Sequence, residues 1–187
     1  MLLGCAILAA AAFSSSRALA AAPEESPVCE REMTRAAKKY DVPLGVLYAV
    51  GLVETGSHGI LHPFAMNIAG PSYFPANLAE ALARFEQARK DGITLIDIGC
   101  MQINHHYHGH QFHSVTEMFD PHENVDYAAR FLKELRAKEG SWTLAAARYH
   151  AGPGSNPAQK QYVCAVISNM VASGFGAWTE NARSFCH

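Results

Sequence analysis

The sequence has little charge and no surplus of either sign. Asp, Glu, Lys and Arg make up 17% of its 187 residues, and 15 basic against 17 acidic side chains give a formal net charge of −2. The chain therefore lacks the basic surplus that is typical of nucleic-acid-binding proteins and of polybasic membrane patches. Because 49% of the residues are hydrophobic, an intrinsically disordered chain is excluded as well. The length suits one domain with a buried core.

The sequence also lacks an apolar run of the roughly 20 residues that a membrane-spanning helix needs. Residues 2–13 are almost wholly apolar or small, and Ala18-Leu19-Ala20 follows. A short run that ends in such a pattern is typical of a secretory signal peptide, although no Lys or Arg precedes it here. We predict a signal peptide over 1–20, a leader over 21–27 and one folded domain over 28–187, in a protein exported to the periplasm or secreted. The alternative for the first segment is a buried N-terminal helix.

Cysteine is scarce, and no C-x-x-C pair suggests zinc. Loss of the signal peptide would remove Cys5 and leave an even number of cysteines, namely Cys29, Cys100, Cys164 and Cys186. An even number in an exported chain favours two disulfides, for which three pairings are open. We favour Cys29–Cys186, which would join the two ends, together with Cys100–Cys164. The alternative is four reduced thiols.

The spacing of apolar residues predicts a mainly helical α+β fold with one small antiparallel sheet. Ser114 and Glu117 form the pattern of a capping box for a short helix. Two segments, 65–68 and 93–98, are typical of strands. The longer predicted helices cover residues 28–40, 44–53, 78–90, 120–140, 141–149 and 156–173.

One carboxylate stands at the end of the most apolar predicted helix. Glu54 closes the run 46–53, and Thr55-Gly56-Ser57 then ends the helix. Such a carboxylate would lie where the core meets a cleft, and apolar walls disfavour its ionised form. A side chain that keeps its proton is what a general acid needs. The alternative is a solvent-facing glutamate at a frayed helix end.

Two later segments give Glu54 a context. They are Gly99-Cys100-Met101-Gln102-Ile103-Asn104 and Ala147-Arg148-Tyr149-His150-Ala151-Gly152. Together with Glu54-Thr55-Gly56, and in this order, they resemble the three signature motifs of the soluble-type lytic transglycosylases. The resemblance implies a lysozyme-like fold and the cleavage of bacterial peptidoglycan. The chain departs from the family pattern at Thr55, Cys100 and His150, where Ser, Leu and Asn are usual.

The resemblance also implies a mechanism with a single catalytic carboxylate. Glu54 would act as acid and then as base on the bond between N-acetylmuramic acid and N-acetylglucosamine, and the product would be a 1,6-anhydromuramoyl end. No cofactor is expected. Gln102 and Asn104 would face the sugar from one side of an extended segment. Tyr149 would bond to Glu54 or to an acetamido group, His150 would contact the N-acetyl group, and Tyr162 would support Glu54.

Two features near these motifs allow other interpretations. Asp97 could be the second carboxylate that a hydrolase needs, but we favour a carboxylate that holds backbone N–H groups at a strand end. A loop carries five histidines, which could bind a metal or form a polar rim of the cleft; no H-E-x-x-H pattern is present, and we predict no metal. These histidines are His105, His106, His108, His110 and His113.

The expected partner is the glycan strand of peptidoglycan, and no nucleic acid and no stable membrane span is expected. The segment 65–70 before Asp97 resembles an insertion in the subgroup found near conjugation and secretion systems, which adds such a machine as an expected partner. Two other functions compete with the transglycosylase. One is a non-catalytic peptidoglycan-binding or scaffold protein, and the other is a lysozyme-type hydrolase.

Overall fold

The structure is a computed structural model, and it describes residues 27–55, 60–151 and 156–187. The predicted signal peptide and residues 21–26 of the leader lie outside the described residues. Among the described residues, no helix combines the length and the apolar character needed to cross a bilayer.

The long helices follow the apolar pattern closely. The predicted bounds agree within two residues for α1 (Val28–Tyr40), α2 (Leu44–Thr55), α3 (Leu78–Lys90), α6 (Pro121–Glu139), α7 (Trp142–Ala151) and α8 (Asn156–Ala172). The predicted capping box opens α5 (Val115–Phe119), where the Ser114 hydroxyl accepts a hydrogen bond from the Glu117 amide. The pattern did not show α4 (His105–His108), the 3-10 turn η1 (Gly109–Gln111) or α9 (Glu180–Cys186).

Four short strands form one antiparallel sheet in the order β2-β1-β3-β4. Their bounds are β1 (Met66–Ile68), β2 (Ser72–Tyr73), β3 (Ile96–Ile98) and β4 (Ile103–Asn104). The predicted strand 93–98 is half as long as expected because the Ile93 amide bonds to the Ala88 carbonyl and finishes the end of α3. The register pairs Asn67 with Asp97 and Asp97 with Asn104, which sets these polar side chains in one row.

Helix α2 is apolar on nearly all sides and lies among α1, α7 and α8. Its contact with α1 is close at Gly51, where an added Cβ would meet Met33 Cε at 2.6 Å. The C-terminal end of α2 is thereby fixed within the core, and Glu54 and Thr55 occupy that end.

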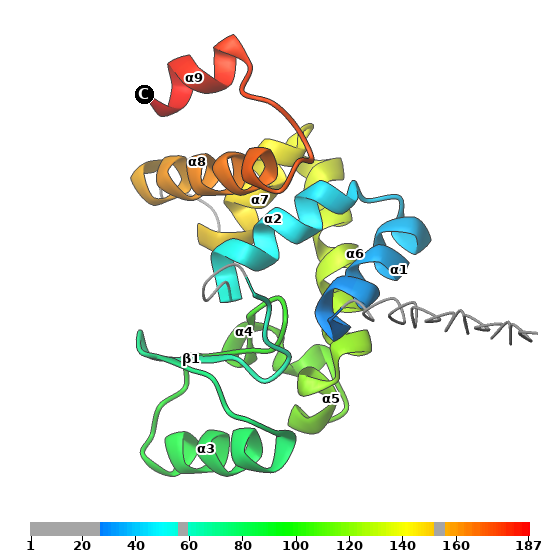
Figure 1. Ribbon diagram of the computed structural model, residues 1–187. Helices are drawn as coiled ribbons and strands as arrows, with labels where there is room; N and C mark the ends of the chain where they lie inside the picture. Colours follow the sequence, from blue (N-terminus) through cyan, green and yellow to red (C-terminus); the bar gives the residue numbers. More distant parts are fainter. Residues whose placement is uncertain (1–26, 56–59, 152–155) are drawn as a thin grey trace, which may run out of the picture.

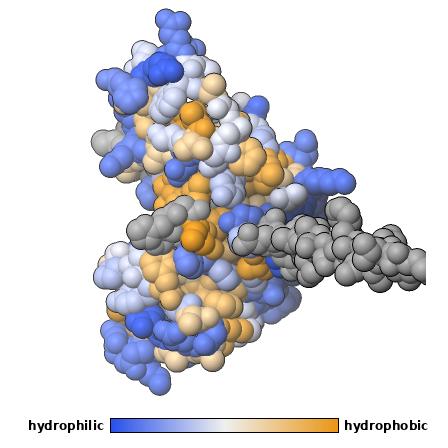
Figure 2. All heavy atoms as spheres, viewed as in Figure 1, coloured by the Kyte–Doolittle hydropathy of each residue, from blue (hydrophilic) through white to orange (hydrophobic). Residues whose placement is uncertain are grey.

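The elements form two parts with the C-terminal end of α2 between them. Figure 1 shows α3 and the sheet on one side, and the helices α1, α2, α6, α7 and α8 on the other. Figure 2 shows hydrophilic residues covering both ends of the molecule, while hydrophobic residues gather near the waist between them.

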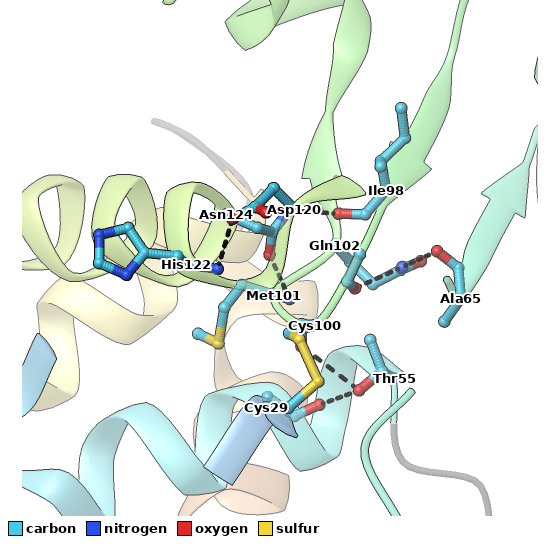
Figure 3. The surroundings of a disulfide bond; sticks show 12 residues. Cys29, Thr55, Ala65, Ile98, Cys100, Met101, Gln102, Asp120, His122 and Asn124 are labelled. Carbon is cyan, nitrogen blue, oxygen red and sulfur yellow. Dashed lines mark hydrogen bonds between the residues drawn. A yellow bond between two sulfur atoms is a disulfide. The ribbon is translucent and has the colours of Figure 1, made fainter. Parts of the chain in front are cut away.

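The disulfide pairing that we favoured is wrong. The bonds join Cys29 to Cys100 and Cys164 to Cys186. The first turn of α1 lies against the loop that follows β3 (Figure 3), and α9 folds back on α8, so the two ends of the domain do not meet. Two disulfides are nevertheless present, as expected for an exported protein.

Candidate active site

A cleft of about 670 Å³ opens between the sheet and the helices. The residues that line it come from α2, β3, the loop between β3 and β4, β4, α4, α6 and α7. Both polar groups and aromatic rings line its walls. The lining residues are Glu54, Asp97, Gln102, Ile103, Asn104, Tyr107, His108, Phe131, Arg148, Tyr149 and His150.

Glu54 lies at the junction that the sequence predicted, between the apolar core and the cleft. Its side chain is 15% exposed, so the alternative of a solvent-facing glutamate does not hold. Its Oε1 is buried and has no hydrogen-bond partner of normal geometry among the described residues. Buried polar atoms are nearly always paired, and an unpaired carboxylate oxygen in a cleft is a common sign of a functional group.

The loop between β3 and β4 is held against the end of α2 by buried hydrogen bonds (Figure 3). The Thr55 hydroxyl donates to the Gly51 carbonyl and lies 3.4 Å from the Cys100 carbonyl oxygen. From the other side, the Asn124 amide accepts from the Met101 N–H at 2.9 Å and donates to two carbonyl oxygens, those of Ile98 and Met118. The first two motifs are therefore in direct contact, although 45 residues separate Thr55 from Cys100.

Gln102 and Asn104 both line the cleft, but not on one extended segment as predicted. Residues 99–102 form a tight turn closed by a bond from the Gln102 amide to the Gly99 carbonyl, and Gln102 has a φ of 46°. The Gln102 side chain donates to the Ala65 and Gly99 carbonyls. Asn104 caps α4 by accepting from the His106 and Tyr107 amides. Both side chains thus also hold the wall of the cleft in shape.

Two tyrosines lie beside Glu54. The Tyr149 hydroxyl donates to the Met101 carbonyl at 2.8 Å. Of its two predicted partners, Glu54 is therefore not bonded, and the acetamido group of the substrate stays a prediction. Tyr162 is buried on α8, and its hydroxyl has no hydrogen-bond partner of normal geometry among the described residues. Burial, followed by the charge of Glu54, raises the pKa of both phenols well above 10, so both stay neutral and able to donate.

Asp97 is a second carboxylate in the cleft, where we had favoured a carboxylate that holds backbone N–H groups. It accepts a hydrogen bond from the Asn104 side chain at 2.7 Å. Burial raises the pKa of Asp97, and the negative charge of Glu54 raises it further, against the lowering effect of the Asn104 bond. A carboxyl in a cleft whose pKa is raised by burial and by a neighbouring like charge is typical of catalytic sites.

The histidine loop does not gather its rings at one point. His105 packs against Phe85, His106 against Tyr107, and His108 bonds through Nδ1 to the Tyr127 hydroxyl at 2.7 Å. In the part of the chain that the structure describes, no group of three or more His, Cys, Asp or Glu side chains is placed to hold a metal ion. Burial lowers the pKa of His105 and of His108, which favours their neutral forms.

The sequence predicted five lining residues and the neighbouring Tyr162, and it missed others. Tyr107 is 61% exposed on α4, at the edge of the cleft. Phe131 comes from the apolar face of α6, where the pattern shows a core residue and no more. Arg148 lies within the third motif and pairs with Glu139 at 3.0 Å. Arg148 could have been predicted as a cleft residue because it lies within the third motif. Tyr107 and Phe131 lie in none of the three motifs.

No curated protein and no solved structure matches the chain. A family model, the transglycosylase SLT domain, matches residues 32–166. The match covers most of the chain and contains Glu54, the loop between β3 and β4, the third motif and Tyr162. The chain therefore belongs to the transglycosylase SLT domain family, the soluble lytic transglycosylases of the lysozyme-like superfamily.

Proposed function

We propose that the protein is a peptidoglycan lytic transglycosylase in which Glu54 is the catalytic acid and base. The bond cleaved is the β-1,4 linkage between N-acetylmuramic acid and N-acetylglucosamine. One observation carries this proposal: the Glu54 carboxylate ends a buried helix at a cleft, with a buried oxygen that has no hydrogen-bond partner of normal geometry among the described residues. Family membership supplies the substrate class.

In each reaction Glu54 gives one proton to the leaving sugar and takes another from the attacking hydroxyl. Protonated Glu54 donates to the glycosidic oxygen, the C1–O bond breaks, and an oxocarbenium-like transition state forms on the muramoyl sugar. The C6 hydroxyl of the same sugar then attacks C1, and its proton passes to the Glu54 carboxylate. The product carries a 1,6-anhydro ring, and no water is consumed.

The other groups of the cleft bind and orient the sugar in this proposal. The Gln102 side-chain nitrogen is bonded to backbone carbonyls, so its amide oxygen is the group left to face substrate. Tyr107 offers an exposed ring on which a sugar face can stack. Tyr162 is neutral and places its hydroxyl near Glu54, where it stabilises the carboxylate that forms after proton donation.

A lysozyme-type hydrolase is the second candidate, and Asp97 favours it. Two-carboxylate glycosidases place a second Asp or Glu across the scissile bond from the acid. Asp97 lines the same cleft, and the charge of Glu54 contributes to the raised pKa of Asp97 after burial. In such an enzyme water, and not the C6 hydroxyl, would complete the reaction.

Digestion of purified sacculi separates these functions. We expect the wild type to release fragments whose masses lack an added water, and Glu54→Gln to lose activity by a factor on the order of 10²–10⁴, the usual share of general acid catalysis. Glu86→Gln, a change at an exposed position on α3, is the matched control and should keep full activity.

Each other outcome contradicts a specific part of the proposal. Fragments heavier by one water identify a hydrolase. An inactive wild type that still binds sacculi identifies a non-catalytic binding protein. A Glu54→Gln variant with the activity of the wild type removes Glu54 from the mechanism.

The compartment and a partner machine belong to the same proposal. Two disulfides need an oxidising compartment, which supports export to the periplasm or beyond. A cell-envelope machine for secretion or conjugation is the partner that would need a local gap in the peptidoglycan. Co-purification of the mature protein with envelope complexes tests this association.

A further inference from the structure

His150 lies against the proposed catalytic carboxylate. It stands on α7, and its Nδ1 is 3.5 Å from Glu54 Oε1, the oxygen that lacks a partner of normal geometry among the described residues. Its ring stacks on Tyr162 with centroids 4.2 Å apart and planes 9° apart, which fixes the plane of the imidazole. The His150 side chain is 44% exposed, whereas Glu54 is 15% exposed. Both side chains line the cleft, and the imidazole is the more exposed of the two.

Negative charge surrounds the imidazole from two elements. Glu54 faces it from α2 and Asp97 from β3, while Tyr162 from α8 is neutral. On its own helix, Tyr149 and the cationic Arg148 precede it in the cleft wall. The hydrogen-bonding contact with Glu54 raises the pKa of His150 against the lowering effect of burial, and the charges of Glu54 and Asp97 raise it further.

We propose that His150 is the proton partner of Glu54: the two side chains hold one proton between Nδ1 and Oε1, and substrate entry moves it to the carboxylate. The inference rests on the proposed function, because it deepens the role of the same site. His150 is a positioning residue in this scheme, since it acts on the sugar through Glu54.

The separation of 3.5 Å is long for a hydrogen bond, and contacts of this kind commonly tighten when substrate binds. In the open cleft, water stabilises the charged pair of imidazolium and carboxylate. When a sugar displaces this water, the charged pair loses solvation and the neutral pair is favoured. The N–H bond of the imidazolium then breaks and the O–H bond of Glu54 forms. The pair keeps one proton throughout, so no other donor is required.

A pair that shares a proton titrates as a unit. In the pH–rate profile, the fall in rate on the alkaline side is the alkaline limb, and it reports the loss of the shared proton from the pair. In His150→Asn, the limb belongs to Glu54 alone and lies at lower pH, because the second site that binds the proton is gone. Above the wild-type limb, the concentration of protonated Glu54 is nearly the same in both proteins, so their rates should converge there.

Titration of the histidine ring signals by NMR tests the pair without relying on activity. The His150 signal is identified by its absence from His150→Asn. We expect its midpoint to fall in Glu54→Gln, and to fall less in Asp97→Asn, because Asp97 acts on His150 through charge alone. Circular dichroism checks that the variants are folded, and the rate profiles of the wild type and His150→Asn are then recorded.

The outcomes separate the pair from the activity. An unchanged His150 midpoint in Glu54→Gln overturns the inference, whatever the enzyme does. A midpoint that falls while the wild type leaves sacculi intact supports the pair and overturns the proposed function. In an active enzyme, an alkaline limb at the same pH in His150→Asn and in the wild type also overturns the inference.

Discussion

Asn124 shows how one buried side chain can hold a motif in place. It is fully buried in the first turns of α6, and its amide makes three hydrogen bonds, to the end of β3, to the loop between β3 and β4, and to the end of α5. Gly99 lies directly against it, and a Cβ there would come within 2.5 Å of Asn124 Nδ2. The glycine of the second motif is therefore required by the asparagine as well as by its own backbone angle.

Gly99→Ala should destabilise the protein more than Gly92→Ala does. Both glycines have a positive φ, 80° and 78°, at which an L residue costs roughly 1–2 kcal/mol. A Cβ at Gly92 meets nothing within 4 Å, whereas a Cβ at Gly99 overlaps Asn124 and adds about 1–3 kcal/mol of overpacking. Urea unfolding of both variants measures the difference in free energy. If both variants lost the same free energy of unfolding, Asn124 would move aside for the new Cβ at no cost to stability.

At the scale of elements, the sequence predicted what periodicity can report. Helices such as α1 and α6 carry an apolar face over at least three turns, and α2 is apolar all round, so their bounds were close to the prediction. Two-residue strands such as β2 and β4 are too short to show alternation, and the four residues of α4 have no buried face. Helix α9 had one signal in the sequence, the Thr179 cap that accepts from the Ala182 amide.

A charged cluster joins α1 to α6. Asp126 on α6 accepts from Lys39 Nζ at 2.6 Å and from the Tyr40 hydroxyl at 2.7 Å, and it pairs with Arg35. Burial alone would raise the pKa of Asp126, but these three donors together lower it to about 2. A carboxyl whose pKa is lower in the folded state than in the unfolded state stabilises the fold above the unfolded value and loses this effect at lower pH.

Asp126→Asn should therefore lower the free energy of unfolding near neutral pH, by about 1–2 kcal/mol after allowance for the exposure of the Lys39 end. The deficit relative to wild type should shrink as pH falls below 3.8 and should nearly vanish near the folded pKa of about 2. Urea unfolding at pH 7 and pH 3 measures it. Asp91→Asn, at the exposed end of α3, is the matched control. If Asp126→Asn lost the same free energy of unfolding at pH 7 and at pH 3, Asp126 would act by packing rather than by charge.

At the scale of the whole molecule, the sequence predicted which residues form the candidate site better than it predicted which residues contact one another there. Three motifs named Glu54, Gln102 and His150, and the fold brings all three to one cleft. Their partners depend on how distant segments meet. The Tyr149 hydroxyl bonds to the Met101 carbonyl, and Asp97 lines the same cleft as Glu54 and feels its charge. Neither relation has a pattern in the sequence. The disulfide pairing failed for the same reason, because spacing along the chain does not state which ends meet in space.

The two disulfides should differ both in stability and in their effect on the site. In the chain-entropy model, the bond across 71 residues stabilises by about 4 kcal/mol and the bond across 22 residues by about 3 kcal/mol.

The double variant Cys29→Ala with Cys100→Ala also releases the backbone at position 100 from α1. The next residue is Met101, whose backbone N–H and carbonyl bond to Asn124 and Tyr149. We expect it to lose both stability and cleavage of sacculi. The pair Cys164→Ala with Cys186→Ala, which removes only the covalent link between α8 and α9, should lose stability and keep cleavage under conditions where it remains folded. Urea unfolding and turbidity clearing of sacculi measure the two effects. If the two double variants cleave equally well while folded, the Cys29–Cys100 bond is a brace for the fold and plays no part in shaping the cleft.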